Sequence, residues 1–194
     1  MAFLIINASP RKGKNCYCVL ENVKNILDDN NLKYRVIDIY DLNIDYCNAC
    51  GYCEKTGHCR INDDMKSLYR EFNDSIGTVV VSPVYFDSVP AKLKTLIDRT
   101  QAFYASKYIL KKPSIDRNKN RVGMFISIGG SRAYKTQFLG GEIVIDFFFK
   151  SINTKLIHKY YLANTDEIEV KSNLDALEDI KNLTLDLIDR ASKN

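Results

Sequence analysis

Hydrophobic and polar positions follow two different periods along the chain. Five short runs are almost continuously apolar, and the longer segments between them carry apolar residues at three- and four-residue intervals. Short continuous runs are typical of strands buried on both faces, and the longer period is typical of amphipathic helices. The predicted strands are Ala2–Ala8, Tyr34–Ile39, Gly77–Val81, Val122–Ile128 and Lys155–Leu162.

Five helices are predicted between and after these strands. One follows the first strand and ends near Asn30, and the others cover Met65–Phe72, Pro90–Ala102, Phe138–Ile152 and Asn173–Ile188. For the last of them, Ser172 and Asp175 predict a capping box. We expect Lys92, Lys94 and Arg99 to form the solvated side of the helix that starts at Pro90.

The alternation of strands and helices predicts an α/β fold with a parallel sheet covered by helices on both faces. Five strands in this pattern favour a flavodoxin-like, doubly wound, five-stranded sheet of order 2-1-3-4-5, with a nucleotide-binding Rossmann arrangement as the alternative. The chain has 194 residues and no internal repeat. We therefore expect a single domain over residues 1–194, with a cysteine-rich loop at 45–62.

The charge distribution and the N-terminal pattern argue against nucleic-acid-binding, secreted and membrane proteins. The net charge of +4 comes from lysines and arginines scattered among acids, which argues against a nucleic-acid or membrane partner. The apolar run Ala2–Ile6 precedes Arg11 and Lys12, the reverse of the order in a signal peptide, so a cytoplasmic location is expected. The most apolar stretch, Ile143–Phe149, is too short to span a membrane and is broken by Asp146.

Ligands of doubly wound sheets bind beyond the carboxyl ends of the strands. After the first strand, Ser9, Arg11, Gly13 and Asn15 precede a helix whose free N–H groups and dipole favour an anion such as a phosphate. Neither G-x-G-x-x-G nor G-x-x-x-x-G-K-[ST] is present. A plain polar turn with a capped helix explains this loop equally well.

Two further loops add features that suit a flat heterocycle. After the third strand, Pro83–Phe86 combines a rigid turn with two aromatic side chains. After the fourth strand, Gly129 and Gly130 permit close approach of the backbone to a ring. Each loop is a weak signal alone, but three of them meeting at one edge of the sheet favour a flavin.

Four of the six cysteines lie close together, as Cys47, Cys50, Cys53 and Cys59 in the spacing C-x2-C-x2-C-x5-C. This spacing suits the thiolate ligands of one iron-sulfur cluster. Zinc or free thiols remain alternatives, although zinc sites usually use two separate C-x2-C pairs. His58 is either a neighbour or ligand of the cluster or an exposed loop residue.

Cys16, Cys18 and His158 fall in predicted regular elements. We expect Cys18, and also Cys16, to be small core residues, as buried free cysteines usually are. His158 lies in the last predicted strand and is expected to be structural.

Five segments together resemble one known family, the iron-sulfur flavoproteins, within the FMN-binding NAD(P)H reductases of flavodoxin-like fold. They are Ser9–Arg11, Cys47–Cys59 with Asp63-Asp64-Met65, Ser82–Phe86, Leu93–Arg99, and Arg121–Met124 leading to Gly129 and Gly130.

The resemblance implies two cofactors, FMN and a [4Fe-4S] cluster. The FMN phosphate would be held by Ser9, Arg11 and Asn15, with Cys16 and Tyr17 at the helix start. The ring would lie against Pro83, Val84, Tyr85, Phe86, Gly129, Gly130 and Arg132, and the cluster would be bound by Cys47, Cys50, Cys53 and Cys59. A homodimer or homotetramer is also implied, in which cluster and flavin of different subunits approach each other.

Two departures from the family pattern concern the flavin. Cys16 stands where relatives commonly place a serine or threonine hydroxyl, and a thiol is the poorer hydrogen-bond donor. After Gly130 the usual glycine-rich continuation is replaced by residues 131–136, which affects the outer edge of the ring.

The leading hypothesis is an electron-transfer flavoprotein, an oxidoreductase that relays electrons between a donor such as ferredoxin and FMN and onward to a small-molecule acceptor. No side chain is singled out as catalytic, because the hard chemistry belongs to the cofactors. The alternative is an NAD(P)H-dependent FMN or quinone reductase without a functional cluster, and a redox sensor is a third possibility. The apolar helix Phe138–Ile152 is either buried in the monomer or part of a subunit interface.

Overall fold

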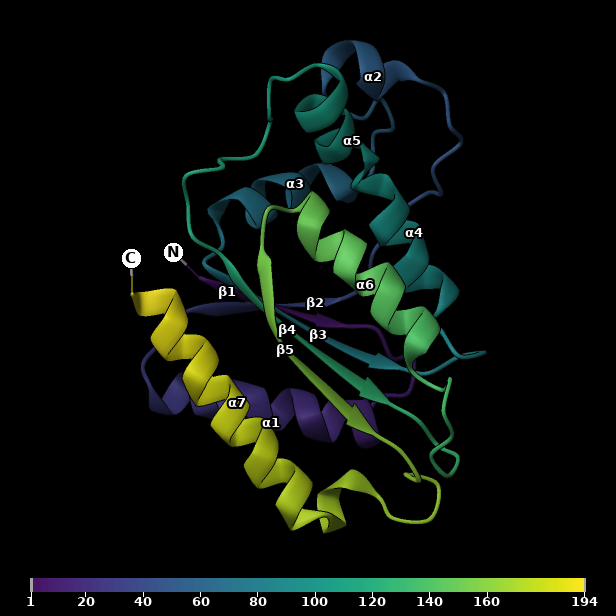
Figure 1. Cartoon of the computed structure of the whole chain (residues 1–194), viewed down its shortest axis with the longest axis vertical. Helices are drawn as coiled ribbons and strands as arrows, with labels where there is room; N and C mark the ends of the chain where they lie inside the picture. The colour runs from purple at the N-terminus through teal and green to yellow at the C-terminus, as the bar shows by residue number, and fades with distance from the viewer. Residues whose placement is uncertain (1, 194) are drawn as a thin grey trace.

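The computed structural model describes residues 2–193. Its five strands form one parallel sheet in the order β2-β1-β3-β4-β5 (Figure 1). They are β1 (Phe3–Asn7), β2 (Tyr34–Asp38), β3 (Gly77–Pro83), β4 (Val122–Ile128) and β5 (Lys155–Leu162). This is the predicted flavodoxin-like order, and it excludes the Rossmann alternative.

Helices cover both faces of the sheet (Figure 1). On one face lie α1 (Asn15–Asp29) and α7 (Leu174–Ser192), and on the other lie α3 (Met65–Asp74), α4 (Ala91–Arg99) and α6 (Leu139–Ser151). Their buried apolar residues form one hydrophobic cluster on each side, as the helical period predicts. The capping box predicted for the last helix is wrong in its first residue. Asn173, not Ser172, caps α7, because Asn173 Oδ1 accepts a hydrogen bond from the Ala176 amide at 3.1 Å.

Four short elements complete the fold. They are α2 (Tyr52–Thr56), α5 (Gln101–Tyr104), a π-helix over Ala105–Ile109 and a 3-10 turn over Val170–Ser172. The cysteine segment contains α2, which packs against α5 and the π-helix at one end of the molecule (Figure 1). Among the helices of residues 2–193, none combines the length and the apolar character needed to cross a membrane.

The helix that starts after Pro90 carries an unexpected residue. Lys94 is exposed and pairs with Asp98 along the helix, as expected. Arg99, in contrast, is only 1% exposed, so the prediction that it belongs to the solvated side is wrong. The physical reason is a carboxylate from a distant segment, Asp63, which pairs with Arg99 inside the protein.

Candidate functional site

A cavity of about 440 Å³ lies at the carboxyl ends of the strands. We call it the switch-point cavity, because the order in which the strands are added to the sheet reverses between β1 and β3. The loops after β1, β3, β4 and β5 line it with Ser9, Arg11, Lys14, Asn15, Cys16, Pro83, Val84, Tyr85, Phe86, Asp87, Ile128, Gly129, Gly130, Ser131, Tyr134, Gln137, Thr165 and Asp166. The loop after β2 is beside it, since Lys12 pairs with Asp41 at 3.4 Å.

The loop after β1 is shaped by local hydrogen bonds. The Ser9 amide donates to Asn7 Oδ1 at 3.2 Å, and the Arg11 amide donates to Ser9 Oγ at 3.2 Å. Gly13 has φ +71°, a conformation that favours glycine, just before α1 begins. The first turn of α1 carries no acidic side chain, so its free N–H groups and the Arg11 guanidinium favour an anion at this end of the cavity.

Cys16 lies at this helix start and is buried, as expected of a core cysteine. Burial raises the pKa of its thiol to about 12, and a hydrogen bond with Ser9 and the charge of Arg11 offset only part of this rise. Cys16 is therefore a neutral thiol at neutral pH and does not repel an anion in the cavity.

Asn15 joins the start of α1 to the loop after β5. Its Nδ2 donates to the Thr165 carbonyl at 3.2 Å, and its Oδ1 accepts from the Val170 amide at 3.0 Å. The loop after β5 is also hydrogen-bonded to the loop after β4, because Thr165 Oγ1 donates to the Gly129 carbonyl at 3.1 Å. One N–H and one lone pair of the Asn15 amide remain for a ligand.

The loop after β3 makes a tight turn whose aromatic side chain faces outward. Tyr85 and Ser88 exchange backbone hydrogen bonds of 2.9 and 3.0 Å. Phe86 and Asp87, between them, have φ of 49° and 57°, which is unusual for residues other than glycine, and the Phe86 side chain is fully exposed. A large aromatic side chain held in this way is available to contact a planar ligand.

Asp87 connects this turn to the segment after β4. Its carboxylate accepts hydrogen bonds from the Tyr134 hydroxyl and from Thr136 Oγ1, and its carbonyl accepts from the Gly141 amide at 3.2 Å. The hydrogen bond to Asp87 is also the main reason why the pKa of Tyr134 is raised. The β3 and β4 loops thus form one wall of the cavity.

Side chains pack closely against the two glycines after β4. A Cβ atom on Gly129 would lie 2.4 Å from Gln137 Nε2, and one on Gly130 would lie 2.4 Å from Asp166 Oδ2. Both distances are well below van der Waals contact, so the backbone is brought close to the cavity as the sequence predicts.

Most of the residues predicted for FMN are brought together in the switch-point cavity. Ser9, Arg11, Asn15, Cys16, Pro83, Val84, Tyr85, Phe86, Gly129 and Gly130 all line it. Tyr17 does not, since it packs against the hydrophobic cluster beside α1. Arg132 does not either, and its Nη2 pairs with Glu167 at 2.9 Å.

The sequence analysis places Ser131 and Tyr134 only within the segment 131–136, and it does not assign eight of the lining residues individually. They are Lys14, Asp87, Ile128, Ser131, Tyr134, Gln137, Thr165 and Asp166. Thr165 and Asp166 follow β5, a loop that carries no motif but that ends at the same edge of the sheet. The rule that ligands bind at the carboxyl ends of parallel strands was the one signal available for them.

A second cavity, of about 340 Å³, brings the four clustered cysteines together. We call it the cysteine cavity. It is lined by Cys47, Asn48, Ala49, Cys50, Gly51, Cys53, Glu54, Cys59, Arg60, Ile61, Asp98, Arg99, Gln101 and Ala102. All six cysteines of the chain are free thiols. Burial raises the pKa of the Cys53 thiol, and the neighbouring Cys59 and Cys47 raise it further.

The cysteine cavity offers four thiols as donors. Among residues 2–193, no three His, Cys, Asp or Glu side chains are grouped to hold one metal ion. Four thiolates are the ligand set of one [4Fe-4S] cluster and also of one zinc ion. Arg99 also lines the cavity, and its buried Nε has no hydrogen-bond partner in the described chain. His58 is exposed and is not part of the lining.

Comparison with known proteins places this geometry in a family. Residues 1–137 match the family model described as NADPH-dependent FMN reductase. An iron-sulfur flavoprotein of Methanosarcina thermophila is 33% identical over 127 residues, covering 66% of this chain and 62% of its own. One of Methanocaldococcus jannaschii is 30% identical over 160 residues, covering 82% of this chain and 70% of its own.

Structural comparison agrees on the fold. A solved structure described as a flavone reductase superposes with a TM-score of 0.74 at 15% sequence identity, covering 100% of this chain and 64% of that one. The first three curated relatives are matched over 61% to 64% of their own length. The chain therefore belongs to the iron-sulfur flavoproteins, a group within the family of NADPH-dependent FMN reductases.

Proposed function

We propose that this chain is an FMN- and [4Fe-4S]-containing electron-transfer flavoprotein, an oxidoreductase that relays electrons between a donor such as ferredoxin and FMN. One observation carries the proposal. The chain contains a cavity at the carboxyl ends of the strands and a separate cavity lined by all four clustered cysteines. Family membership supports a flavin in the first cavity and a cluster in the second.

The switch-point cavity would hold FMN with its phosphate at the start of α1. Ser9, Arg11, Asn15 and Cys16 offer a hydroxyl, a cation, an amide and a neutral thiol there, beside the free N–H groups of the helix. Pro83–Phe86 with Gly129 and Gly130 would hold the ring. When bound, FMN supplies one- and two-electron redox chemistry, and these residues position it and exclude water from one side.

The cysteine cavity would hold the cluster through Cys47, Cys50, Cys53 and Cys59. A bound [4Fe-4S] cluster supplies single-electron transfer at a potential that its surroundings set. Cys47 and Cys50 are exposed, so a redox partner could reach this side of the protein. We expect that partner to be a ferredoxin-like protein or a small-molecule acceptor in the cytoplasm, with no nucleic acid or membrane involved.

Assembly into a homodimer or homotetramer completes the proposal. Within residues 2–193, no residue lines both cavities. Leu139, Ile143 and Phe147 are 51%, 53% and 66% exposed, and their spacing places them on one face of α6. That helix begins next to the switch-point cavity, where the Gly141 amide donates to the Asp87 carbonyl. A second copy seated on this face would lie beside the flavin.

Cofactor analysis of anaerobically purified protein tests the proposal. Iron, labile sulfide, zinc and FMN are counted in the wild type and in Cys53→Ala. We expect about four iron and four sulfide per chain in the wild type, and loss of iron with retention of FMN in the variant. Zinc without sulfide in the wild type would contradict the cluster, and absence of FMN would contradict the flavin site.

Sedimentation tests the assembly. Phe147→Glu places a charge on the exposed face of α6 and should shift the protein toward the monomer. Phe148 is fully buried, so its substitution would unfold the chain instead of probing an interface. Leu174→Glu is the control, because Leu174 is 73% exposed and lies on α7, which covers the opposite face of the sheet. An unchanged sedimentation coefficient for folded Phe147→Glu would remove this face from the interface.

A second candidate is an NAD(P)H-dependent FMN or quinone reductase in which the cysteines bind nothing redox-active. It is favoured by the lack of a preformed ion site among residues 2–193 and by the description of the matching family model. Rapid reduction of bound FMN by NAD(P)H in iron-free protein would support it. Slow reduction by NAD(P)H, together with rapid reduction by reduced ferredoxin, would support the first proposal.

A further inference from the structure

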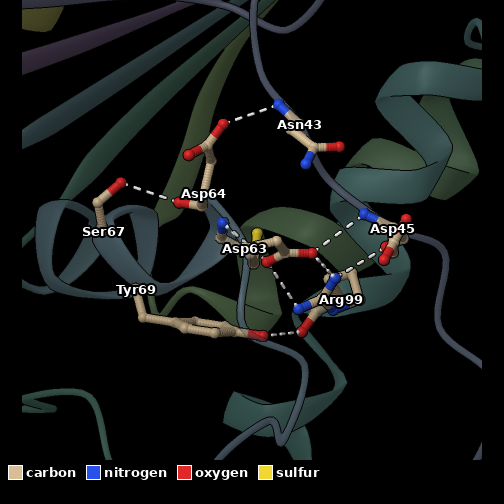
Figure 2. Close-up of polar contacts among 8 residues, drawn as sticks. Asn43, Asp45, Asp63, Asp64, Ser67, Tyr69 and Arg99 are labelled. Atoms are coloured by element: carbon tan, nitrogen blue, oxygen red, sulfur yellow. Dashed lines mark hydrogen bonds and ion pairs between the residues drawn. The ribbon is translucent and has the colours of Figure 1, made fainter.

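Arg99 has an unusual position for an arginine at the end of a helix. It is 1% exposed, and Asp63, its partner, has a side chain that is 3% exposed. Arg99 Nη1 donates to Asp63 Oδ2 at 2.5 Å and Nη2 donates to Asp63 Oδ1 at 3.1 Å (Figure 2). Burying two charges in this way is costly unless the pair is well hydrogen-bonded, so its presence here needs a reason.

The pair closes the segment that carries the cysteines. Arg99 Nη1 also donates to the Asp45 carbonyl at 2.8 Å, and Asp63 Oδ2 accepts from the Asp45 amide at 3.0 Å. Asp45 lies two residues before Cys47, and Asp63 lies four residues after Cys59. Both ends of the cysteine segment are therefore fixed to one guanidinium (Figure 2).

Neighbouring contacts hold Arg99 itself in place. The Tyr69 hydroxyl donates to the Arg99 carbonyl at 2.6 Å, and Asp63 Oδ1 accepts from the Met65 amide at 3.1 Å. Burial raises the pKa of Asp63, but hydrogen bonds from Arg99 and the Asp45 amide lower it more, so the carboxyl stays ionised. The guanidinium thus has a fixed position and a fixed charge.

Arg99 borders the cysteine cavity and Asp63 does not. Arg99 Nε is buried and has no hydrogen-bond partner in the described part of the chain. A buried N–H of a charged group is normally satisfied, so Arg99 keeps one donor that the described residues do not use.

The four clustered cysteines share the lining of this cavity with Arg99. Cys47, Cys50, Cys53 and Cys59 all border the same volume of about 340 Å³ as Arg99 does. A group bound by these thiols would therefore lie beside the buried arginine.

We propose that Arg99 is a positioning residue for the cluster of the cysteine cavity, one that fixes the cysteine segment and raises the reduction potential of the cluster by placing a buried positive charge beside it. This inference rests on the proposed [4Fe-4S] function. A cluster with four thiolate ligands gains one negative charge when it accepts one electron. A fixed cation nearby stabilises that reduced form and so raises the potential.

The test compares midpoint potentials, followed by electron paramagnetic resonance during a dithionite titration. In Arg99→Met the potential should become more negative than in the wild type. In Arg99→Lys, which keeps the charge and loses the planar fork, it should lie between the two. In Asp63→Asn, which removes the opposing carboxylate, it should become more positive. Unchanged potentials in Arg99→Met or in Asp63→Asn would overturn the inference.

Arg121 provides a matched control. It is 2% exposed, donates to the Asp116 and Asn73 carbonyls at 2.6 Å each, and also has an Nε without a partner among the described residues. It is not part of the cysteine cavity. Arg121→Met should therefore destabilise the chain and leave the cluster potential unchanged. A shift as large as that of Arg99→Met would show that any buried arginine has this effect, and would overturn the inference.

Iron and sulfide counts keep the two proposals separable. Wild-type protein without iron and sulfide would contradict the proposed function itself. Wild-type protein with a full cluster, and variants with full clusters and unchanged potentials, would contradict the role of Arg99 alone. Loss of iron in folded Arg99→Met, with iron retained in Arg121→Met, would support the positioning role. If Arg99→Met does not fold, the sign of the shift in Asp63→Asn decides.

Discussion

The switch-point cavity and the cysteine cavity are built on different parts of the fold. The first is lined by loops that follow directly on buried strands, and backbone hydrogen bonds join those loops, such as the Asp166 amide to the Gly130 carbonyl at 3.0 Å. The second lies on a segment whose regular structure is limited to the five residues of α2. Its ends are held by the side chains of Arg99 and Asp63. The first cavity is formed by loops anchored on strands, whereas the Arg99–Asp63 pair is the buried ion pair that joins the ends of the segment around the second.

Of the substitutions considered, removal of the Asp63 carboxylate should have the largest effect on stability while leaving the switch-point cavity intact. Asp63→Ala leaves the buried Arg99 guanidinium without its counter-charge, and we expect the free energy of unfolding to fall by about 3–5 kcal/mol. Urea denaturation of cofactor-free protein measures this loss. FMN affinity of the folded fraction should remain at the wild-type value, because Asp63 takes no part in the switch-point cavity.

Asp98→Ala is the control for this experiment. Asp98 pairs with Lys94 on the surface of α4, one residue before Arg99. An exposed pair of this kind contributes less than about 1 kcal/mol. Equal destabilisation by both substitutions would show that the burial of the Arg99–Asp63 pair has no special importance.

Arg99 also shows where prediction from the sequence ends. The strands and their order followed from the alternation of periods, because a sheet buried on both faces needs continuous apolar runs. Lys92, Lys94 and Arg99 looked alike on the basis of helical spacing. What distinguishes Arg99 is a carboxylate 36 positions away in the chain, and no local pattern contains that information.

The residues of the switch-point cavity also divide into those that the sequence predicts and those that it does not. The loops after β1, β3 and β4 were predictable because each carries hydroxyl, aromatic or glycine residues directly after a strand. Thr165 and Asp166 were not, since their place depends on pairing with Gly129 and Gly130 after the sheet has formed. Arg132 was assigned to the flavin from the family pattern, but its guanidinium pairs with Glu167.

One glycine substitution beside each cavity should affect the cofactor of that cavity alone. In Gly130→Ala the new Cβ would lie 2.4 Å from Asp166 Oδ2, so the Asp166 carboxylate, which lines the cavity, must shift. We expect FMN binding to weaken by about 1–3 kcal/mol, the usual cost of overpacking. Fluorescence quenching of FMN during titration measures it.

Gly51→Ala is the counterpart in the cysteine segment. Gly51 has φ +68°, but its new Cβ would meet nothing closer than a Glu54 side-chain oxygen at 4.0 Å. Backbone strain of roughly 1 kcal/mol should therefore lower iron content and leave FMN affinity unchanged. Weaker FMN binding in Gly51→Ala would contradict the independence of the two cavities.

Alkaline pH should act on the switch-point cavity through Cys16. Burial raises the pKa of this thiol from 9.0 to about 12 in the folded chain, so the folded state holds a proton that the unfolded state releases. The resulting stabilisation is complete below pH 9 and is lost as the pH rises toward 12. At pH 10 the loss is about 1.4 kcal/mol.

Comparison with Cys16→Ser isolates this contribution, because all other titrating groups are common to both proteins. The free energy of unfolding of the wild type, relative to that of Cys16→Ser, should decrease between pH 8 and pH 10. A constant difference would show that the thiol titrates at its ordinary pKa and is solvated. Cys18→Ser serves as a second reference, since burial raises the pKa of Cys18 as well but this thiol lies outside the cavity lining.

The smallest effect concerns FMN affinity at neutral pH. Cys16→Ser replaces a weak donor by a hydroxyl at the start of α1, where the phosphate would bind. One improved hydrogen bond contributes about 0.5–1.5 kcal/mol, so the dissociation constant for FMN should fall by roughly two- to tenfold. Riboflavin, which lacks the phosphate, should bind wild type and variant equally. Equal gains for FMN and riboflavin would place the phosphate elsewhere and separate Cys16 from the anion site, whereas a gain confined to FMN would fix the orientation of the flavin in this cavity.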